Sequence, residues 1–316
     1  MTHKVHVSVV IPVYDRLEVL ERALRFFEFQ TYPKSLFEVV IVDDGSPTAI
    51  DKTISRTSWR FNHRIVRQDN HGRASARNTG VDRAQGSLII FSDADRLPSP
   101  LFVAEHVAFH ERWAGAACVG VPWDCFLMWD KLREFGEEGL PTMKRYSRRP
   151  LYHQLFSRLL PLERCTSHVS WAGFLVGNSS LAKGVLQKVG GFDERLKSWG
   201  IEHFELAWRL RQQCGTEVRF MGLAESFHVP HLRDRGYFVA GIDDCIAALA
   251  DAPSAGAMGQ LRKFMLGEIS LQELERQYLD SGSPEPRYSE ALFYDALRSA
   301  PNVITGSVSE KGQIRA

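Results

Sequence analysis

Residues 88–95 read Leu-Ile-Ile-Phe-Ser-Asp-Ala-Asp. Leu88 to Ser92 form a short apolar run, typical of a buried strand, and two carboxylates follow at Asp93 and Asp95. In a parallel sheet, the residues after a strand's carboxyl end face the crevice where α/β proteins bind ligands. Two acids there repel each other and lose hydration unless a cation neutralises them. The stretch therefore predicts a divalent cation that is shared with the phosphates of a nucleotide diphosphate. The alternative is a pair of solvated turn acids.

Composition excludes several classes of protein. The 316 residues have room for one large domain or about two ordinary ones, and the apolar share of 44% with 24% charged residues is that of a globular protein. A net charge of +1 gives no general attraction to nucleic acid. The five cysteines are scattered without C-x-x-C spacing, which predicts reduced, packing cysteines and no zinc site.

The beginning of the sequence, Met1-Thr2-His3-Lys4-Val5-His6, has no signal-peptide pattern, and no apolar run reaches the ~18 residues of a membrane span. We expect a cytoplasmic protein, with peripheral association at the inner membrane surface as an alternative. A homodimer stays open.

Strand and helix patterns alternate along the first part of the chain. Strands are predicted at 7–13, 37–42, from 65, at 88–92 and at 117–121, with helices at 17–27, 48–58, 72–84 and 101–113 between them. This order predicts an α/β fold with a mostly parallel sheet that helices cover on both faces. Further on, the patterns indicate a strand at 172–177, helices at 182–189 and from 202, and a closing strand at 217–221.

The same patterns predict the domain organisation. One α/β domain spans residues 1–235, with a helical insertion at about 124–165, a C-terminal helical extension at 236–300 and a flexible tail at 301–316. The extension could bind an acceptor, cap the site or form a dimer.

Acidic residues follow three of the predicted parallel strands, at Asp15, at Asp43 and Asp44, and at Asp93 and Asp95. Because such strand ends meet at one edge, we expect a ligand site there. Asp43 or Asp44 could accept an N–H from a nucleobase.

Arg73 and Arg77 lie one turn apart on the following helix, where guanidinium groups could reach a diphosphate. The alternative is a solvated helix face.

A second candidate region carries Glu202 and His203 at a predicted helix start. Acids are favoured there by the helix dipole, so a simple helix start is one interpretation and a general base is the other. Glu205 and Arg209, four residues apart, suggest a structural ion pair. His228 could complete a metal site begun by carboxylates, or could be a packing residue.

These motifs occur together in an ordered series: Val9-Val10-Ile11-Pro12-Val13-Tyr14-Asp15-Arg16, Val42-Asp43-Asp44-Gly45-Ser46, Ala76-Arg77-Asn78-Thr79-Gly80, Ser92-Asp93-Ala94-Asp95, Gly190-Gly191-Phe192-Asp193 and Trp199-Gly200-Ile201-Glu202. The series resembles the family-2 glycosyltransferases of the GT-A (Rossmann-like) fold over roughly residues 5–230. The second half is also similar to the polypeptide N-acetylgalactosaminyltransferases and the chondroitin-polymerising enzymes, which share a Trp-Gly-x-Glu helix.

The resemblance implies a metal-dependent glycosyltransferase that uses a nucleotide sugar, most often a UDP-sugar, with Mn²⁺ or Mg²⁺. It implies that Pro12, Tyr14 and Asp44 line the nucleoside pocket, that Arg73 lies near the base or diphosphate, and that Asp93 approaches the ribose or sugar. Asp95 would bind the metal and His228 would complete its coordination. The full candidate set for donor binding is Pro12, Tyr14, Asp15, Asp43, Asp44, Arg73, Arg77, Asp93 and Trp199, and the candidate metal ligands are Asp93, Asp95 and His228.

One departure concerns catalysis. Inverting family members usually carry Glu-Asp in the Trp-Gly helix, with the Asp as general base, whereas this chain has Glu202-His203. Either residue could act as the base, with inversion as the expected outcome and retention as the alternative.

A non-catalytic nucleotide-sugar binding module is the competing function. A nucleotidyltransferase is disfavoured by the Trp-Gly segment and by the lack of a triphosphate loop, and a dinucleotide oxidoreductase by the lack of G-x-G-x-x-G. The acceptor stays open between a glycan, a lipid-linked sugar, a peptide and a small metabolite.

Overall fold

The structure is a computed structural model that describes residues 6–159, 167–198, 200–229 and 235–278. Its strands are β1 (Val7–Val13), β2 (Phe37–Asp44), β3 (Asn62–Gln68), β4 (Leu88–Ser92), β5 (Arg96–Pro98), β6 (Ala117–Cys125), β7 (Ser147–Arg148), β8 (Asn178–Ala182) and β9 (Val218–His228). Its α-helices are α1 (Leu17–Glu28), α2 (Asp51–Ile54), α3 (Arg73–Arg83), α4 (Phe102–Arg112), α5 (Trp129–Leu132), α6 (Leu140–Arg145), α7 (Leu151–Leu159), α8 (Lys183–Lys188), α9 (Glu202–Cys214), α10 (Arg235–Ala248), α11 (Ala255–Met265) and α12 (Leu271–Arg276). Short 3₁₀ helices are η1 (Glu137–Gly139) and η2 (Ser170–Gly173).

One sheet joins all the described strands in the order β3-β2-β1-β4-β8-β6-β9-β5, with β7 paired to β6. The first four strands are parallel, as the alternating strands and helices predict. From β8 onward the pairing is mixed, because β8 runs antiparallel to β4 and β6 while β6 and β9 are parallel. The α/β class is confirmed, and the parallel arrangement is concentrated in the first half of the sheet.

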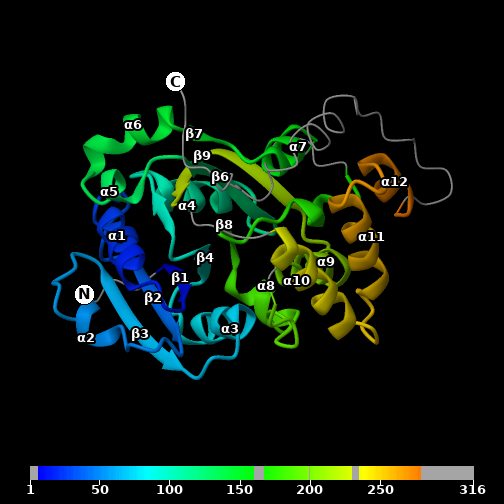
Figure 1. The fold of residues 1–316 in the computed structure, drawn as a ribbon, viewed down its shortest axis with the longest axis horizontal. Helices are drawn as coiled ribbons and strands as arrows, with labels where there is room; N and C mark the ends of the chain where they lie inside the picture. Colours follow the sequence, from blue (N-terminus) through cyan, green and yellow to red (C-terminus); the bar gives the residue numbers. More distant parts are fainter. Residues whose placement is uncertain (1–5, 160–166, 199, 230–234, 279–316) are drawn as a thin grey trace.

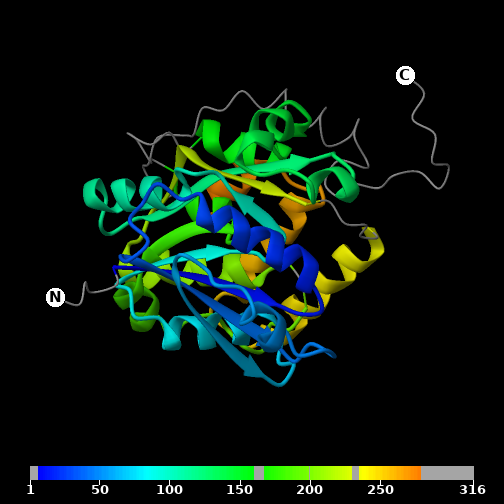
Figure 2. The ribbon, with the colours of Figure 1, turned by 90° about the vertical axis from the view of Figure 1, so that its left-hand side faces the viewer.

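Alternate side chains of the central strands enter two separate cores. Val9 and Ile11 of β1 pack with α1 and α4, whereas Val10 packs with α3 on the opposite face. In α1 the buried residues recur at helical spacing, and Figure 2 shows this helix in front of the sheet. Both faces of the sheet are therefore covered, which explains why β2 and β4 are buried along their whole length.

The prediction of a strand at 172–177 is wrong. Residues 170–173 form η2, and the strand begins only at Asn178. Trp171 and Phe174 are fully buried, so the apolar run reflects a loop segment inside the core rather than a strand. Short apolar runs do not distinguish these two cases.

The closing strand is longer than 217–221, because β9 continues to His228. Its parallel register with β6 pairs Asp124 with His228.

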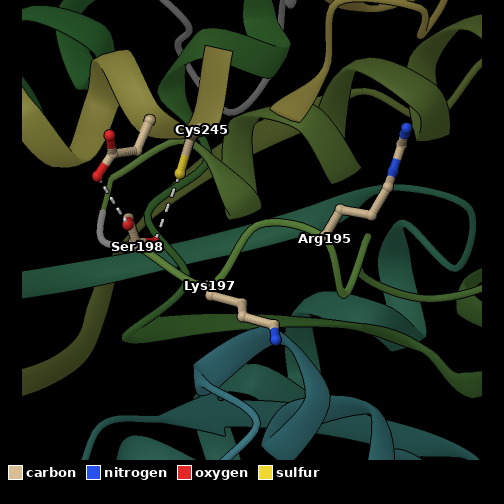
Figure 3. Close-up of a pocket in the computed structure, with 5 residues that line it drawn as sticks. Arg195, Lys197, Ser198 and Cys245 are labelled. Carbon is tan, nitrogen blue, oxygen red and sulfur yellow. Dashed lines mark hydrogen bonds between the residues drawn. The ribbon is translucent and has the colours of Figure 1, made fainter. Parts of the chain in front are cut away.

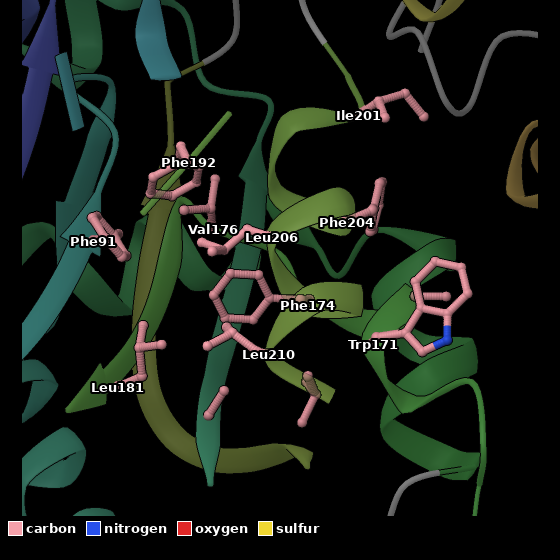
Figure 4. Packing of buried hydrophobic residues seen from close by; sticks show 14 of the residues in the cluster. Phe91, Trp171, Phe174, Val176, Leu181, Phe192, Ile201, Phe204, Leu206 and Leu210 are labelled. Carbon is pink, nitrogen blue, oxygen red and sulfur yellow. The ribbon is translucent and has the colours of Figure 1, made fainter. Parts of the chain in front are cut away.

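The C-terminal helices share the core of the sheet domain. Figure 4 shows Phe174, Leu206 and Leu210 gathered around α9, and the same cluster includes Ile242 of α10 and Leu261 of α11. These helices lie on the side of the molecule opposite α1 and α2 (Figure 1). No helix in the described ranges is long and apolar enough to cross a lipid bilayer.

A buried polar network fixes α4 against the sheet. His106 lies 2.8 Å from Ser180 Oγ and 3.0 Å from Asn178 Oδ1, and His110 also contacts Ser180. Burial lowers the pKa of His106 to about 3 and that of His110 to about 4. Both histidines are therefore neutral in the folded protein.

We expect the free energy of unfolding to fall as the pH decreases below about 6.5, the ordinary histidine pKa. In this window the unfolded chain binds protons that folded His106 and His110 do not take up until about pH 3 and 4. Each histidine then removes up to ~1.4 kcal/mol per pH unit. Urea unfolding across this range measures the slope of the free energy of unfolding against pH. His106→Gln should reduce this slope, whereas His63→Gln, at an exposed site, is the control and should not. Equal slopes in the wild type and His106→Gln would contradict the prediction.

Candidate active site

The carboxyl ends of β1, β2 and β4 meet at one edge of the sheet, as predicted. The Asp43 carboxylate accepts hydrogen bonds from Ser46 N at 2.9 Å and from the guanidinium of Arg67. The Ser46 hydroxyl in turn accepts a hydrogen bond from the backbone N–H of Asp15, and Asp15 adopts a left-handed φ of 50°. Asp43 thus holds the turn after β2 against the turn after β1.

Asp44 holds the loop before α3. Its carboxylate accepts hydrogen bonds from Gln68 Nε2 at 2.8 Å, His71 N at 3.0 Å and Gly72 N at 2.9 Å. Gly72 has a φ of +91°, which glycine tolerates best. Of the other residues expected around the nucleoside, Pro12 is half-buried and Tyr14 is half exposed.

Arg77 occupies the centre of the site. Its side chain is only 2% exposed and donates to Glu202 Oε1 at 3.0 Å and to Asp93 Oδ1 at 3.1 Å. One guanidinium therefore joins α3, the end of β4 and the start of α9. The alternative of a solvated helix face is wrong for Arg77, because its side chain is buried and paired with two carboxylates.

The Gly190-Gly191-Phe192-Asp193 motif packs against Arg77. The ring of Phe192 lies 5.5 Å from Arg77 Cζ, and its backbone exchanges two hydrogen bonds with the Asn78 amide. A Cβ at Gly191 would approach Asn78 Oδ1 to 2.5 Å, so glycine is required for this close contact. The motif at 76–80 and the motif at 190–193, which lie far apart in the sequence, are therefore in direct contact.

Glu202 is fully buried and ionised. Its carboxylate also accepts a hydrogen bond from Gly200 N at 3.1 Å. Burial raises the pKa of Glu202, but His203, Arg73 and Arg77 outweigh burial and hold the pKa well below its usual value. His203 Nδ1 lies 3.6 Å from Glu202 Oε1. As predicted, Glu205 forms a structural ion pair with Arg209, at 2.8 Å.

The two acids after β4 point to different partners. Asp93 faces Arg77, with Arg96 Nε at 3.9 Å, whereas Asp95 lies 3.5 Å from His228 Nε2. A Cβ at Gly177 would approach Asp93 Oδ2 to 2.3 Å, so the loop before β8 closes tightly over this carboxylate.

Asp95 and His228 suit a divalent cation. An ion about 2.1 Å from each atom can bridge a separation of 3.5 Å. His228 Nδ1 lies 3.4 Å from Asp124, an arrangement that holds a metal-binding imidazole in one tautomer. Burial lowers the pKa of His228, but Asp95 and Asp124 raise it to about 9, because their negative charges favour a cation at this position. Within the described ranges no three His, Cys, Asp or Glu side chains form a ready metal cluster, so the remaining ligands would come from water or phosphate.

A small pocket of about 230 Å³ lies beside α3. Its lining residues are Arg195, Lys197, Ser198, Asp244 and Cys245. Figure 3 shows Ser198 joined to α10 through Asp244 and Cys245. Trp199, the next residue, lies outside the described residues, as do 160–165 of the expected insertion and 279–316 of the expected extension and tail.

Sequence reasoning missed Arg67, Arg96 and Asp124 as part of the site. Asp124 follows a predicted strand by three residues, and the register of β6 with β9 places it beside His228. Extending the predicted strand from residue 121 to residue 125 would have placed Asp124 inside it. That extension is the signal that could have identified Asp124.

The mixed sheet with its acidic edge defines a GT-A fold. The family model described as glycosyl transferase family 2 matches residues 8–167, and a model described as the N-terminal domain of galactosyltransferase matches residues 159–232. The chain belongs to glycosyl transferase family 2.

Named relatives agree with this family. Validoxylamine A glucosyltransferase of Streptomyces hygroscopicus subsp. jinggangensis is 33% identical over 247 residues, 73% of this chain and 57% of the relative. Chondroitin synthase of Pasteurella multocida is 27% identical over 222 residues, 64% of this chain and 22% of the relative. The chain thus spans little more than half the length of the first of these relatives.

Solved structures share the fold at low sequence identity. Residues 1–349 of S. aureus TarS in complex with UDP-GlcNAc superimpose with a TM-score of 0.59 at 14% identity, covering 85% of this chain and 77% of that fragment. A mannosyltransferase from Pyrobaculum calidifontis in complex with GDP-Man and Mn²⁺ gives 0.56 at 17% identity, covering 95% of this chain and 81% of that one.

We expect Arg77→Met to lower the free energy of unfolding by ~3–5 kcal/mol, because it leaves buried Glu202 without its cation. Arg77→Met/Glu202→Met should cost much less than the sum of the two single changes, since no buried charge remains unpaired. Urea unfolding measures the cycle, and Arg211→Met, at a partly exposed ion pair, is the control with an expected cost under ~1 kcal/mol. Additive single changes would show that the pair is not coupled.

Proposed function

We propose that the protein moves a sugar from a nucleotide diphosphate sugar, most suitably a UDP-sugar, to an acceptor hydroxyl with the help of Mn²⁺ or Mg²⁺. The observation that carries the proposal is the Asp95–His228 pair beside the buried Arg77–Asp93–Glu202 cluster, all at the carboxyl edge of the sheet. Membership of glycosyl transferase family 2 supports the reaction class. Two similar structures that hold UDP-GlcNAc or GDP-Man with Mn²⁺ support a nucleotide-sugar donor.

The proposed metal ligands are Asp95 and His228, with Asp93 beside them. When bound, a divalent ion would neutralise the charge that builds up on the departing diphosphate. Asp93 is tied to Arg77, but its side chain is 36% exposed, so the carboxylate stays accessible to a ligand. We assign Asp93 to the ribose or sugar rather than to the ion.

The proposed nucleoside pocket lies between the ends of β1 and β2. Asp44 already accepts three hydrogen bonds, two of them from the loop before α3, so it would fix the pocket wall and offer its remaining lone pair to a base. Pro12, Tyr14, Asp15 and Asp43 complete this wall. Arg73, at the first position of α3, would reach the diphosphate with help from the helix dipole, whereas Arg77 would act through Asp93 and Glu202.

The proposed general base is His203. Glu202 is ionised, buried and bound to Arg77 and Gly200 N, so it is a weak proton acceptor with little freedom to move. His203 adjoins Glu202, and a neighbouring carboxylate can stabilise the imidazolium that forms when an acceptor hydroxyl loses its proton. If His203 activates the acceptor for attack opposite the leaving group, the transfer inverts the anomeric carbon.

We expect UDP-glucose or another UDP-sugar to raise the apparent stability of the protein only when Mn²⁺ is present. The shift should reach ~2.7 kcal/mol at a hundredfold excess over Kd, and Asp95→Ala should abolish it because the metal loses a carboxylate ligand. Thermal unfolding against UDP-, GDP-, TDP- and CMP-sugars measures the effect. The control is Asp82→Ala, an exposed acid of α3 away from the strand ends. No shift with any nucleotide sugar would refute the proposed donor binding.

We expect His203→Gln to lower kcat by about 10²–10⁴-fold while leaving donor binding intact, since a base acts on the chemical step. Initial rates of sugar transfer and donor hydrolysis measure kcat, and NMR of the product anomer should show inversion. Glu202→Gln should chiefly lower stability, because Arg77 loses a charged partner. Unchanged kcat in His203→Gln would exclude this base, retention at the anomeric carbon would exclude inversion, and donor binding without any turnover would favour a non-catalytic binding module.

A further inference from the structure

Four side chains form a row across the strands at the metal-binding end of the site. The register pairs Arg96 of β5 with His228 of β9, His228 with Asp124 of β6, and Asp124 with Arg148 of β7. Paired residues of neighbouring strands lie on one face of a sheet. The row therefore runs from the proposed metal ligand His228 through Asp124, which is 37% exposed, to Arg148.

Two exposed aromatic side chains extend this face beyond Asp124. The hydrogen bond from Phe126 N to Tyr146 O continues the β6–β7 pairing by one step past Cys125 and Ser147. Phe126 is 57% exposed and Tyr146 is 51% exposed, which is unusual for adjacent large rings. Phe126 stands two residues from Asp124, about 7 Å along the strand.

Each of these rings carries an arginine. Arg148 Cζ lies 5.6 Å from the centre of the Phe126 ring, and Arg145 Cζ lies 6.0 Å from that of Tyr146. Both arginines are exposed, and neither makes an ion pair within the described part of the chain. This contrasts with Arg77, Arg96 and Arg209, which face carboxylates. We name the group Phe126, Tyr146, Arg145 and Arg148 the aromatic–arginine surface.

We propose that the aromatic–arginine surface binds the acceptor, and that the acceptor is a carbohydrate with an anionic group, a carboxylate or a phosphate. The proposal rests on the proposed function, since it adds the second substrate to that site. The C–H face of a sugar ring suits an aromatic side chain, and an unpaired guanidinium suits carboxylate or phosphate oxygens. A ring bound at Phe126 would lie about one sugar length from Asp124 and the metal ligands.

The position of the surface favours a substrate over a docking partner. It lies where the chain leaves β6 and where α6 leads into β7, along one border of the molecule, and Phe126 is two residues from Asp124 of the site (Figure 1). The exposed Leu223 lies further along the strands, because Glu225, two residues after it, pairs with Val121, five residues before Phe126. A protein or membrane partner would have no need of a contact so close to the metal ligands, whereas an acceptor requires it.

The test is saturation-transfer NMR on the full chain with UDP and Mn²⁺ present. The probes are methyl glucuronide (carboxylate), glucose 6-phosphate (phosphate) and the neutral methyl glucoside. We expect the two charged sugars to bind about tenfold more tightly than the neutral one, a difference of ~1.4 kcal/mol. Arg148→Gln should remove this preference, and Phe126→Ala should weaken all three probes by about tenfold. If only one charged probe shows the preference, it identifies the acceptor's anionic group and supports the proposal.

Matched controls keep the outcome readable. Leu223→Ala removes an equally exposed apolar side chain away from the surface and should change no affinity. UDP affinity, measured in the same samples, should be unchanged in Phe126→Ala and Arg148→Gln, which shows that the variants are folded and separates this proposal from the proposed function. If the wild-type protein does not bind UDP at all, that result would instead refute the proposed function.

Three results would overturn the proposal. The first is equal affinity for charged and neutral sugars, and the second is the absence of saturable binding of both charged probes while UDP binds. The third is binding of the chain to phosphatidylglycerol vesicles that Phe126→Ala and Arg148→Gln abolish without any effect on the sugars, which would assign the surface to a membrane.

Discussion

The structure depends on one buried cation. Arg77 lies beneath the sheet edge with a carboxylate on each side, Asp93 from the end of β4 and Glu202 from the start of α9. A buried guanidinium is tolerated only when its charge is matched, and the two carboxylates provide that match. The helix α3, the strand β4 and the helix α9 are therefore fixed relative to one another by charge as well as by packing. Phe192 closes the group from below.

This arrangement separates the roles of the two acids that follow β4. Because Asp93 is held by Arg77, only Asp95 turns toward His228, and the proposed metal site has two protein ligands rather than three. Open coordination positions are what a diphosphate needs in order to share the ion. The same charge pairing leaves Glu202 ionised and immobile, which moves the proposed base to the adjacent His203.

Local patterns were sufficient for much of the fold. The strands at 7–13 and 88–92 and the helices α1, α3 and α4 coincide with their predictions, because an apolar run or a 3.6-residue period is a local property of the chain. The strand expected at 172–177 was wrong because buried loop and buried strand have the same composition. The position of Asp95 and His228 as neighbours agrees with the resemblance, whereas the sequence left open whether Arg77 is solvated.

The sequence by itself determined which groups reach the crevice, because residues that follow parallel strands must gather at one edge. It also determined the family, through motifs whose order is a property of the chain. Only the tertiary structure decided the partners: that Arg77 lies between two carboxylates, that Asp124 supports His228, and that an arginine lies over each of the neighbouring Phe126 and Tyr146 rings. Register and burial set these contacts, and both depend on strands and helices far apart in the chain.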